Sequence, residues 1–226
     1  MSEKLASIGE ITAGVAHEIN NPVAVIQGNI DVIRTFLGKN AADISTELNL
    51  IDQQVLRIDA IVGKLLQFAR PSEFGTFEET SNLGQIVKDS LVLVNHVILK
   101  DGIEIVCDIT ECPDVKISSG ELQQVVVNLI MNSLQAMTGQ GVLTISSHPC
   151  DRKGIAGASI IVADTGTGIP PDKIKTVFDP FYTTKLGDGT GLGLSISQTL
   201  IQTAGGLITV RNLSPVGAAF TVWLPV

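Results

Sequence analysis

Apolar residues recur at steps of three and four positions through the first seventy residues, and this period limits the fold more than any other feature of the chain. It predicts two amphipathic helices, one on each side of the turn signal Gly38-Lys39-Asn40, with Pro71 ending the second at Arg70. The first apolar stripe consists of Leu5, Ile8, Ile11, Val15, Ile19, Ile26, Ile30, Ile33 and Leu37. The second consists of Leu48, Ile51, Val55, Ile58, Val62 and Leu65.

Two such helices joined by a short turn form a helical hairpin. A hairpin by itself buries only one face of each helix. Two hairpins that pair as a four-helix bundle bury the apolar surface that remains. The stripes in residues 1–70 therefore predict a homodimer.

The composition changes after Arg70. The segment PSEFGTFEE, residues 71–79, is typical of a linker, and from Thr80 onward helical stretches alternate with strand-like runs. Strands are predicted at 103–109, 142–146, 158–163, 207–210 and 218–224. Helices are predicted near 82–99, 121–137 and 192–203, and Ser118 with Glu121 fits a capping box before the middle one. The chain is thus predicted to be α+β: a hairpin at 1–70, a linker at 71–79, and a two-layer α/β sandwich at 80–226.

The overall composition excludes several classes of function. The net charge is −8, and Lys and Arg form no long run, so nucleic acid is not an expected partner. No stretch approaches the roughly 18 continuous apolar residues that span a bilayer, and the start MSEKLASIGE lacks the regions of a signal peptide. The three cysteines have no metal-ligand spacing and are typical of free thiols in a reducing compartment. We expect a cytoplasmic protein segment that makes no membrane contact.

The first candidate for chemistry is His17, which lies off the apolar stripe. A single histidine on a helix is more often a surface residue than a nucleophile. Its neighbours favour function: Glu18 is a carboxylate that can accept a proton, Asn21 lies one turn further on the same face, and Pro22 weakens the helix locally.

Polar side chains also step along the predicted helix at 121–137. Gln124, Asn128 and Asn132 are four positions apart and share one face. Amide oxygens suit hard cations such as Mg²⁺. The alternative is a solvated helix face.

Two glycine-rich segments follow. Asp164, Gly166 and Gly168 come directly after an apolar strand, where glycines let the backbone approach a ligand closely, although the same pattern also makes a simple turn. Gly189, Gly191 and Gly193 precede an apolar helix. Backbone N–H groups that lead into a helix N-terminus can cradle phosphates.

These motifs, in this order, resemble those of the sensor histidine kinase family along nearly the whole chain. His17-Glu18 with Asn21-Pro22 resembles the phosphoacceptor box, and Gln124–Asn132 resembles the asparagine box. The first glycine box, the phenylalanine box and the second glycine box correspond to Asp164–Gly168, Phe178–Lys185 and Gly189–Gly193. The last four boxes are shared with a wider ATPase superfamily that includes heat-shock chaperones and type II topoisomerases, whereas the first is specific to histidine kinases.

The resemblance implies a fold and an activity. The fold would be a dimeric four-helix bundle followed by a Bergerat-type, histidine kinase-like ATPase domain. ATP would bind with Mg²⁺ that Asn128 and Asn132 hold against the phosphates. Asp164 would accept a hydrogen bond from the adenine amino group, and residues 171–190 would form a lid. The implied nucleotide-binding set is Asn128, Asn132, Asp164, Gly166, Gly168, Lys185, Gly189, Thr190, Gly191, Leu192 and Gly193.

The resemblance also implies the catalytic residues and the partner. His17 would accept the γ-phosphoryl group, with Glu18 orienting or deprotonating its imidazole, and the group would pass to the receiver domain of a response regulator. Asn21 would orient a water molecule for a phosphatase reaction. The regulator is expected to dock where the small residues Ala24, Gly28 and Asn29 follow His17. A sensor domain is expected upstream, so the chain would be part of a longer sensor, which can be membrane-bound.

Two other functions are compatible with the motifs. A superfamily ATPase would use the hairpin only to dimerise, but such ATPases carry a water-activating Glu where this chain has Gln124, and an amide is not a base. A nucleotide-gated scaffold would have lost motif residues, and here they are intact. Ala218 and Ala219 depart from the family, which often has hydroxyl residues at these positions.

Overall fold

The computed structural model describes residues 2–69, 79–137, 139–183 and 191–226, and for some helical residues, including 2–18, it describes only the backbone. The chain divides into two compact units, Met1–Glu73 and Phe74–Val226. The predicted linker lies outside the described residues except for Glu79, and the predicted domain bounds of 1–70 and 80–226 stay predictions.

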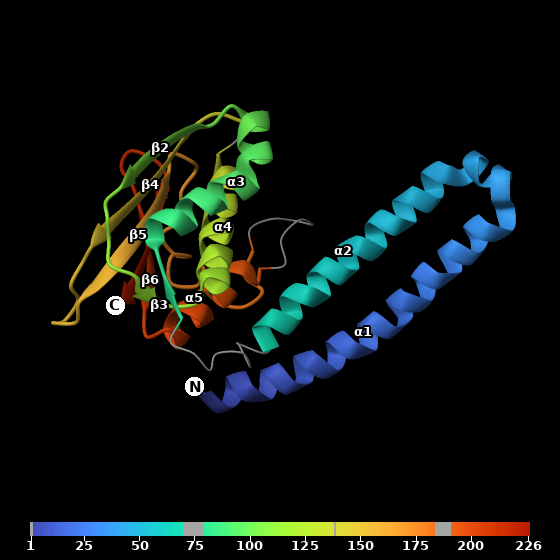
Figure 1. The fold of residues 1–226 in the computed structure, drawn as a ribbon, viewed down its shortest axis with the longest axis horizontal. Coiled ribbons are helices and arrows are strands. Elements are labelled where there is room, and N and C mark those ends of the chain that lie inside the picture. Colours follow the sequence, from blue (N-terminus) through green and yellow to red (C-terminus); the bar gives the residue numbers. More distant parts are fainter. Residues whose placement is uncertain (1, 70–78, 138, 184–190) are drawn as a thin grey trace. The chain divides into compact units, whose positions relative to one another are not determined.

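The first unit is the predicted helical hairpin. Helices α1 (Ser2–Leu37) and α2 (Ser45–Ala69) run antiparallel and are joined by the 3₁₀ helix η1 (Gly38–Ile44) (Figure 1). Helix α1 continues through Pro22. The core between the two helices consists of Val23, Ile30, Leu48 and Val55, with Ile19 and Ile58 partly buried against it.

The apolar stripes are wider than this core. Ile26, Ile33 and Ile51 belong to the predicted stripes but are 44%, 42% and 43% exposed. Val23, which the stripe did not include, is buried, because it follows Ile19 by one helical turn. One hairpin therefore leaves part of its apolar stripes exposed.

A polar network fixes α1 against α2 beside that core. Arg34 Nη2 on α1 donates to Asp52 Oδ2 on α2 and also to Asn49 Oδ1, at 3.3 Å. Gln27 Nε2, two turns earlier on α1, donates to Asp52 Oδ1 at 3.2 Å. These bonds set the register of one helix along the other, which apolar contacts alone specify poorly.

The second unit contains a mixed five-stranded sheet. Its strands are β2 (Glu104–Ile109), β4 (Val142–Pro149), β5 (Gly157–Asp164), β6 (Leu207–Asn212) and β7 (Ala218–Pro225). Their order is β2-β4-β5-β7-β6, with β2 parallel to β4 and the other pairs antiparallel. A separate antiparallel pair is formed by β1 (Thr80–Ser81) and β3 (Val115–Lys116).

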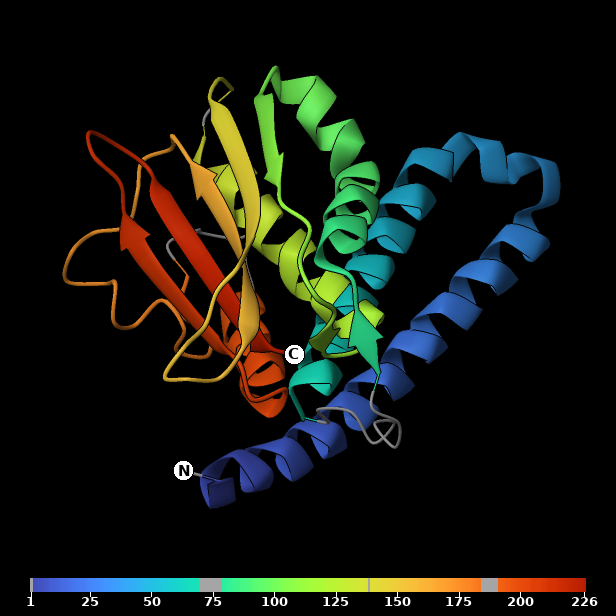
Figure 2. The same cartoon turned by 60° about the vertical axis from the view of Figure 1, so that its left-hand side comes forward.

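Three helices cover one face of this sheet: α3 (Leu83–Asp101), α4 (Ser119–Ala136) and α5 (Gly193–Thr203) (Figures 1 and 2). The layer between them is fully apolar at its centre, where Leu129 of α4, Ile145 of β4 and Val162 of β5 are 0% exposed. The predicted α+β fold, a helical hairpin followed by a two-layer sandwich, is confirmed.

The start of α4 confirms the predicted cap with one difference. Ser118 Oγ accepts from the backbone N–H of Glu121 at 3.3 Å, as an N-cap side chain does. The Glu121 carboxylate accepts from the Ser118 hydroxyl at 2.9 Å. In a capping box this carboxylate would bind the N-cap backbone N–H.

Among the described helices, none combines the length and the apolar character that a bilayer crossing requires.

Candidate functional site

Asp164 is the last residue of β5 and is 2% exposed. Its Oδ1 accepts hydrogen bonds from the backbone N–H groups of Gly166, at 2.9 Å, and Ala218, at 3.3 Å. Both bonds go to the same oxygen, so Oδ2 keeps its capacity to accept. Ala218 has no side-chain hydroxyl, and it contacts Asp164 through its backbone N–H.

Gly166 and Gly168 lie where side chains do not fit. A Cβ on Gly166 would stand 2.6 Å from the carbonyl oxygen of Ala136, at the end of α4. Gly168 has φ +69°, and a Cβ there would stand 3.2 Å from both Asn212 Oδ1 and the Gly217 carbonyl. The loop after Asp164 is therefore held between the end of α4 and the β6–β7 turn, and both glycines are needed for that fit.

Asn128 of α4 lies against the start of α5. Its Nδ2 donates to Ser197 Oγ at 2.9 Å, and a Cβ on Gly193 would overlap Asn128 Oδ1. Asn132 lies one turn further along α4 and is half-buried. The structure thus brings the asparagine box and the second glycine box together, although they are about 60 residues apart in the sequence.

The phenylalanine box meets the second glycine box as well. Gly191 has φ +66°, and a Cβ there would overlap the backbone of Phe181. Leu192, the N-cap residue of α5, is 1% exposed. Lys185, Gly189 and Thr190 lie outside the described residues, and their predicted roles stay predictions.

Helix α1 carries the remaining predicted residues. His17 and Glu18 are helical, and their side chains lie outside the described part of the chain. Asn21, Ala24 and Gly28 are exposed, and a Cβ on Gly28 would meet nothing within 4 Å. The exposed Asn29 donates from Nδ2 to the carbonyl of Val25 at 2.7 Å. The predicted docking residues are therefore exposed in this hairpin.

Two polar side chains at this site were not identified from the sequence. Asn212, at the end of β6, binds both backbone groups of Ile169: Oδ1 accepts from its N–H at 2.9 Å, and Nδ2 donates to its carbonyl at 2.6 Å. Ser197, the partner of Asn128, was also missed. A single Asn after a strand-like run is typical of a turn, so no sequence pattern singled out Asn212.

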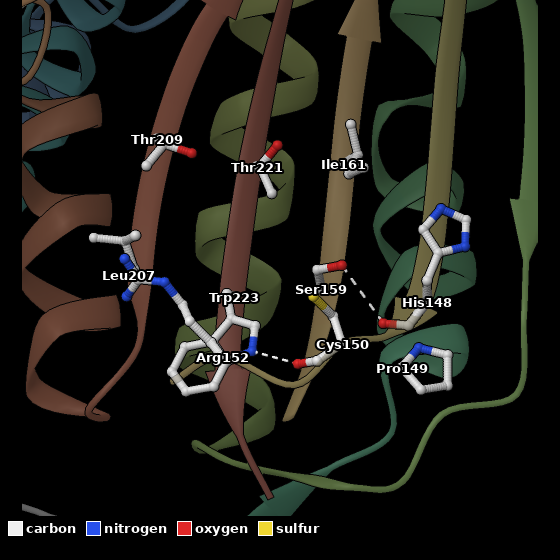
Figure 3. Close-up of a pocket in the computed structure, with 10 residues that line it drawn as sticks. All are labelled: His148, Pro149, Cys150, Arg152, Ser159, Ile161, Leu207, Thr209, Thr221 and Trp223. Carbon is white, nitrogen blue, oxygen red and sulfur yellow. Dashed lines mark hydrogen bonds between the residues drawn. The ribbon is translucent and has the colours of Figure 1, made fainter. Parts of the chain in front are cut away.

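The cysteines and the sheet's other face carry none of the predicted motifs. Cys107, Cys112 and Cys150 are free thiols, and burial raises the pKa of the Cys107 thiol. Within the described residues, no three His, Cys, Asp or Glu side chains gather as a metal site. A hollow on the face away from the helices is lined by Trp223, Arg152, Thr221 and their neighbours (Figure 3). None of the predicted site residues lines it.

Comparison with known proteins shows the family of this chain. Residues 7–73 match the His Kinase A (phospho-acceptor) domain, and residues 118–226 match the histidine kinase-, DNA gyrase B- and HSP90-like ATPase. Sensor histidine kinase ZraS of Salmonella typhimurium is 34% identical over 99% of this chain and 47% of its own length. The chain spans about half the length of such curated relatives.

Two solved structures are similar over nearly the whole chain. Histidine kinase ThkA, in complex with the response regulator protein TrrA, has a TM-score of 0.65 and 28% identity over 99% of this chain and 63% of that chain. Full-length ShkA in complex with AMPPNP has a TM-score of 0.78 over 96% of this chain and 45% of that chain. At 24% identity, the likeness to ShkA shows a shared fold. The chain belongs to the histidine kinase family, and it is the catalytic portion of such a kinase.

Proposed function

We propose that this chain binds ATP with Mg²⁺, phosphorylates His17, and passes the phosphoryl group to an aspartate of a response regulator receiver domain. One observation carries the proposal. The same chain has a helix with the order His17-Glu18-x-x-Asn21 and a second unit in which Asn128 lies against Gly193 and a buried Asp164 accepts from the Gly166 N–H.

Asp164 suits the recognition of adenine. A buried carboxylate is costly unless hydrogen bonds satisfy it, and two backbone N–H groups bind its Oδ1. These bonds also fix the direction of Oδ2. That oxygen would accept from the exocyclic amino group of adenine, a group that guanine lacks at this position, so the pair would select ATP over GTP.

Asn128 and Asn132 suit the binding of Mg²⁺ beside the phosphates. Their amide oxygens are hard ligands on one face of α4, and Ser197 fixes the orientation of the Asn128 amide. When bound, the ion supplies positive charge that neutralises the phosphates. The N-terminal backbone of α5, with the glycines before it and Lys185, would bind the β- and γ-phosphates.

His17 would act as the nucleophile. A ring nitrogen would form the bond to the γ-phosphorus while the bond from that phosphorus to the β–γ bridging oxygen breaks, and ADP would leave with the charge. Glu18 would accept the imidazole proton or orient the ring. Phosphoryl transfer requires positioning and charge neutralisation more than covalent help. Asn21, which is exposed, would orient a water molecule against the regulator's aspartyl phosphate, so the protein would also act as a phosphatase.

We infer a homodimer from the apolar stripe residues that one hairpin leaves exposed. Ile26, Ile33 and Ile51 would be buried by a second copy in a four-helix bundle. Because ATP and response regulators are cytoplasmic, we place these residues in the cytoplasm, as part of a longer sensor that can be membrane-bound.

Incubation with γ-³²P-ATP tests the proposal against the ATPase alternative. Label that is stable in base, labile in acid and lost in His17→Gln would support a histidine kinase. The His17→Gln variant should still bind ATP, because His17 belongs to the other unit of the chain. Release of free phosphate with no label on the protein would refute the kinase and favour the ATPase.

A further inference from the structure

Asn212 makes a two-point contact with a distant part of the chain. Its amide accepts from the N–H of Ile169 at 2.9 Å and donates to the carbonyl of Ile169 at 2.6 Å. Both bonds act on one residue that lies 43 positions earlier in the sequence. An amide uses its acceptor and its donor together in this way only when its position and orientation are both matched to the backbone.

Ile169 lies at the end of the loop that follows Asp164, two residues before the predicted lid at 171–190. The same β6–β7 hairpin holds the start of the loop, because Ala218 N–H donates to Asp164 Oδ1 at 3.3 Å. Between these two points the loop is tied to α4 by the bond from Thr167 N–H to the Ala136 carbonyl, at 3.2 Å. Asn212 therefore holds the end of the loop, and the Asp164–Ala218 contact holds its start.

The fit around Gly168 ties the loop's shape to the same amide. Gly168 has φ +69°. A Cβ added to it would lie 3.2 Å from Asn212 Oδ1 and 3.2 Å from the Gly217 carbonyl oxygen. The β6–β7 turn is itself closed by the bond from Leu213 N–H to the Gly217 carbonyl, at 2.9 Å. A hydrogen-bonded turn thus directly follows Asn212.

We propose that Asn212 is a positioning residue for nucleotide binding: it holds the loop between Asp164 and the lid in its binding conformation before ATP arrives. The proposal rests on the proposed ATP site. Without the two bonds, residues 167–170 would have to be ordered when ATP binds, and the ordering cost would weaken binding. Because the loop is ordered once ATP is bound, the rate of phosphoryl transfer at saturating ATP should change little.

Two substitutions separate hydrogen bonding from packing. Asn212→Ala removes both bonds. Asn212→Asp keeps the shape and the acceptor but sets an oxygen against the Ile169 carbonyl, where the native amide donates. If the bonds carry the effect, both variants should raise the Kd and the KM for ATP by about 5- to 30-fold, the equivalent of one or two hydrogen bonds. The kcat for labelling of His17 should stay within about twofold.

Thr209→Ala is the matched control. Thr209 lies on the same strand, and its side chain is on the face of the sheet away from the helices (Figure 3). This variant should bind ATP as the unsubstituted chain does. Hydrogen exchange gives a readout that needs no nucleotide: the Ile169 amide should be protected in the unsubstituted chain and should exchange faster in both Asn212 variants.

The outcomes are distinct. ATP affinity that is unchanged in both variants, or lowered in Asn212→Ala but normal in Asn212→Asp, would overturn the proposal. So would a loss of kcat with an unchanged KM, which is the result expected from a smaller folded fraction. An Ile169 amide that exchanges freely in the unsubstituted chain would overturn it without any variant. If the unsubstituted chain binds no ATP, the proposed function itself is wrong, and this inference is overturned with it.

Discussion

Replacing Gly193 with alanine tests whether the contact between α4 and α5 serves the nucleotide or only the fold. A Cβ at this position would overlap Asn128 Oδ1 and lie 3.0 Å from Asn128 Cγ. The obstacle is the end of a side chain, so Asn128 can rotate away from it. In doing so it gives up the 2.9 Å bond from its Nδ2 to Ser197 Oγ.

Two opposing effects act on the free energy of unfolding. The lost hydrogen bond costs about 0.5–1.5 kcal/mol. Alanine in place of glycine in a helix recovers up to about 1 kcal/mol, and less at a first-turn position such as this one. The two nearly cancel, so the free energy of unfolding should change by less than about 1 kcal/mol. ATP binding has no such compensation, because the amide proposed to face Mg²⁺ is displaced. We expect the affinity for Mg–ATP to fall at least tenfold, or ~1.4 kcal/mol.

Urea unfolding and calorimetric titration with Mg–ATP measure the two quantities separately. Gly120→Ala is the control: Gly120 lies in the first turn of α4, and a Cβ there would meet nothing within 4 Å. That variant should be as stable as the unsubstituted chain or up to about 1 kcal/mol more stable, with unchanged affinity. A Gly193→Ala variant that binds Mg–ATP normally would show that Asn128 does not hold the metal ion.

Three further predictions concern other parts of the chain. Asp164→Asn keeps the contacts of Oδ1 but turns a donor toward the adenine amino group, so calorimetry should show ATP binding weaker by about 1–3 kcal/mol; normal affinity would contradict the adenine contact. Gly28→Leu should leave labelling of His17 intact and block transfer to the cognate response regulator, and transfer that survives would mean that the docking stretch lies elsewhere. Ser90, on α3, is 0% exposed, and its hydroxyl has no hydrogen-bond partner among the described residues. Urea unfolding should therefore find Ser90→Ala at least as stable as the unsubstituted chain, whereas a loss above about 1 kcal/mol would reveal a partner for the hydroxyl.

Long periodic elements were predictable from the sequence, and short ones were not. Helix α4 was expected at 121–137 and spans Ser119–Ala136, because its apolar period and its cap give independent signals. The two-residue strands β1 and β3 were missed, because two residues are too few to show an alternation. The turn after Leu37 was located correctly, but its 3₁₀ form was not anticipated.

The apolar stripes predicted the positions of the two hairpin helices better than they predicted which stripe residues are buried. The sequence shows which residues share a helix face, but it does not show which neighbouring element covers them. Ile26 and Ile30 therefore have the same predicted burial, although only Ile30 is buried within the hairpin. The candidate site has the same limit. Motif residues could be named one at a time, whereas contacts such as Asn128 with Ser197 or Asn212 with Ile169 arise only when distant segments fold together.

The chain's single tryptophan provides an optical probe of one unit alone. Trp223 is 7% exposed and lies on the sheet face away from the helices, where its Nε1 donates to the Cys150 carbonyl at 2.7 Å and Arg152 stands over its ring (Figure 3). Because the helical hairpin contains no tryptophan, fluorescence follows only the unfolding of the second unit, while far-UV circular dichroism follows the helices of both. Comparing the two signals in one denaturant titration would measure how strongly the two units are coupled in unfolding.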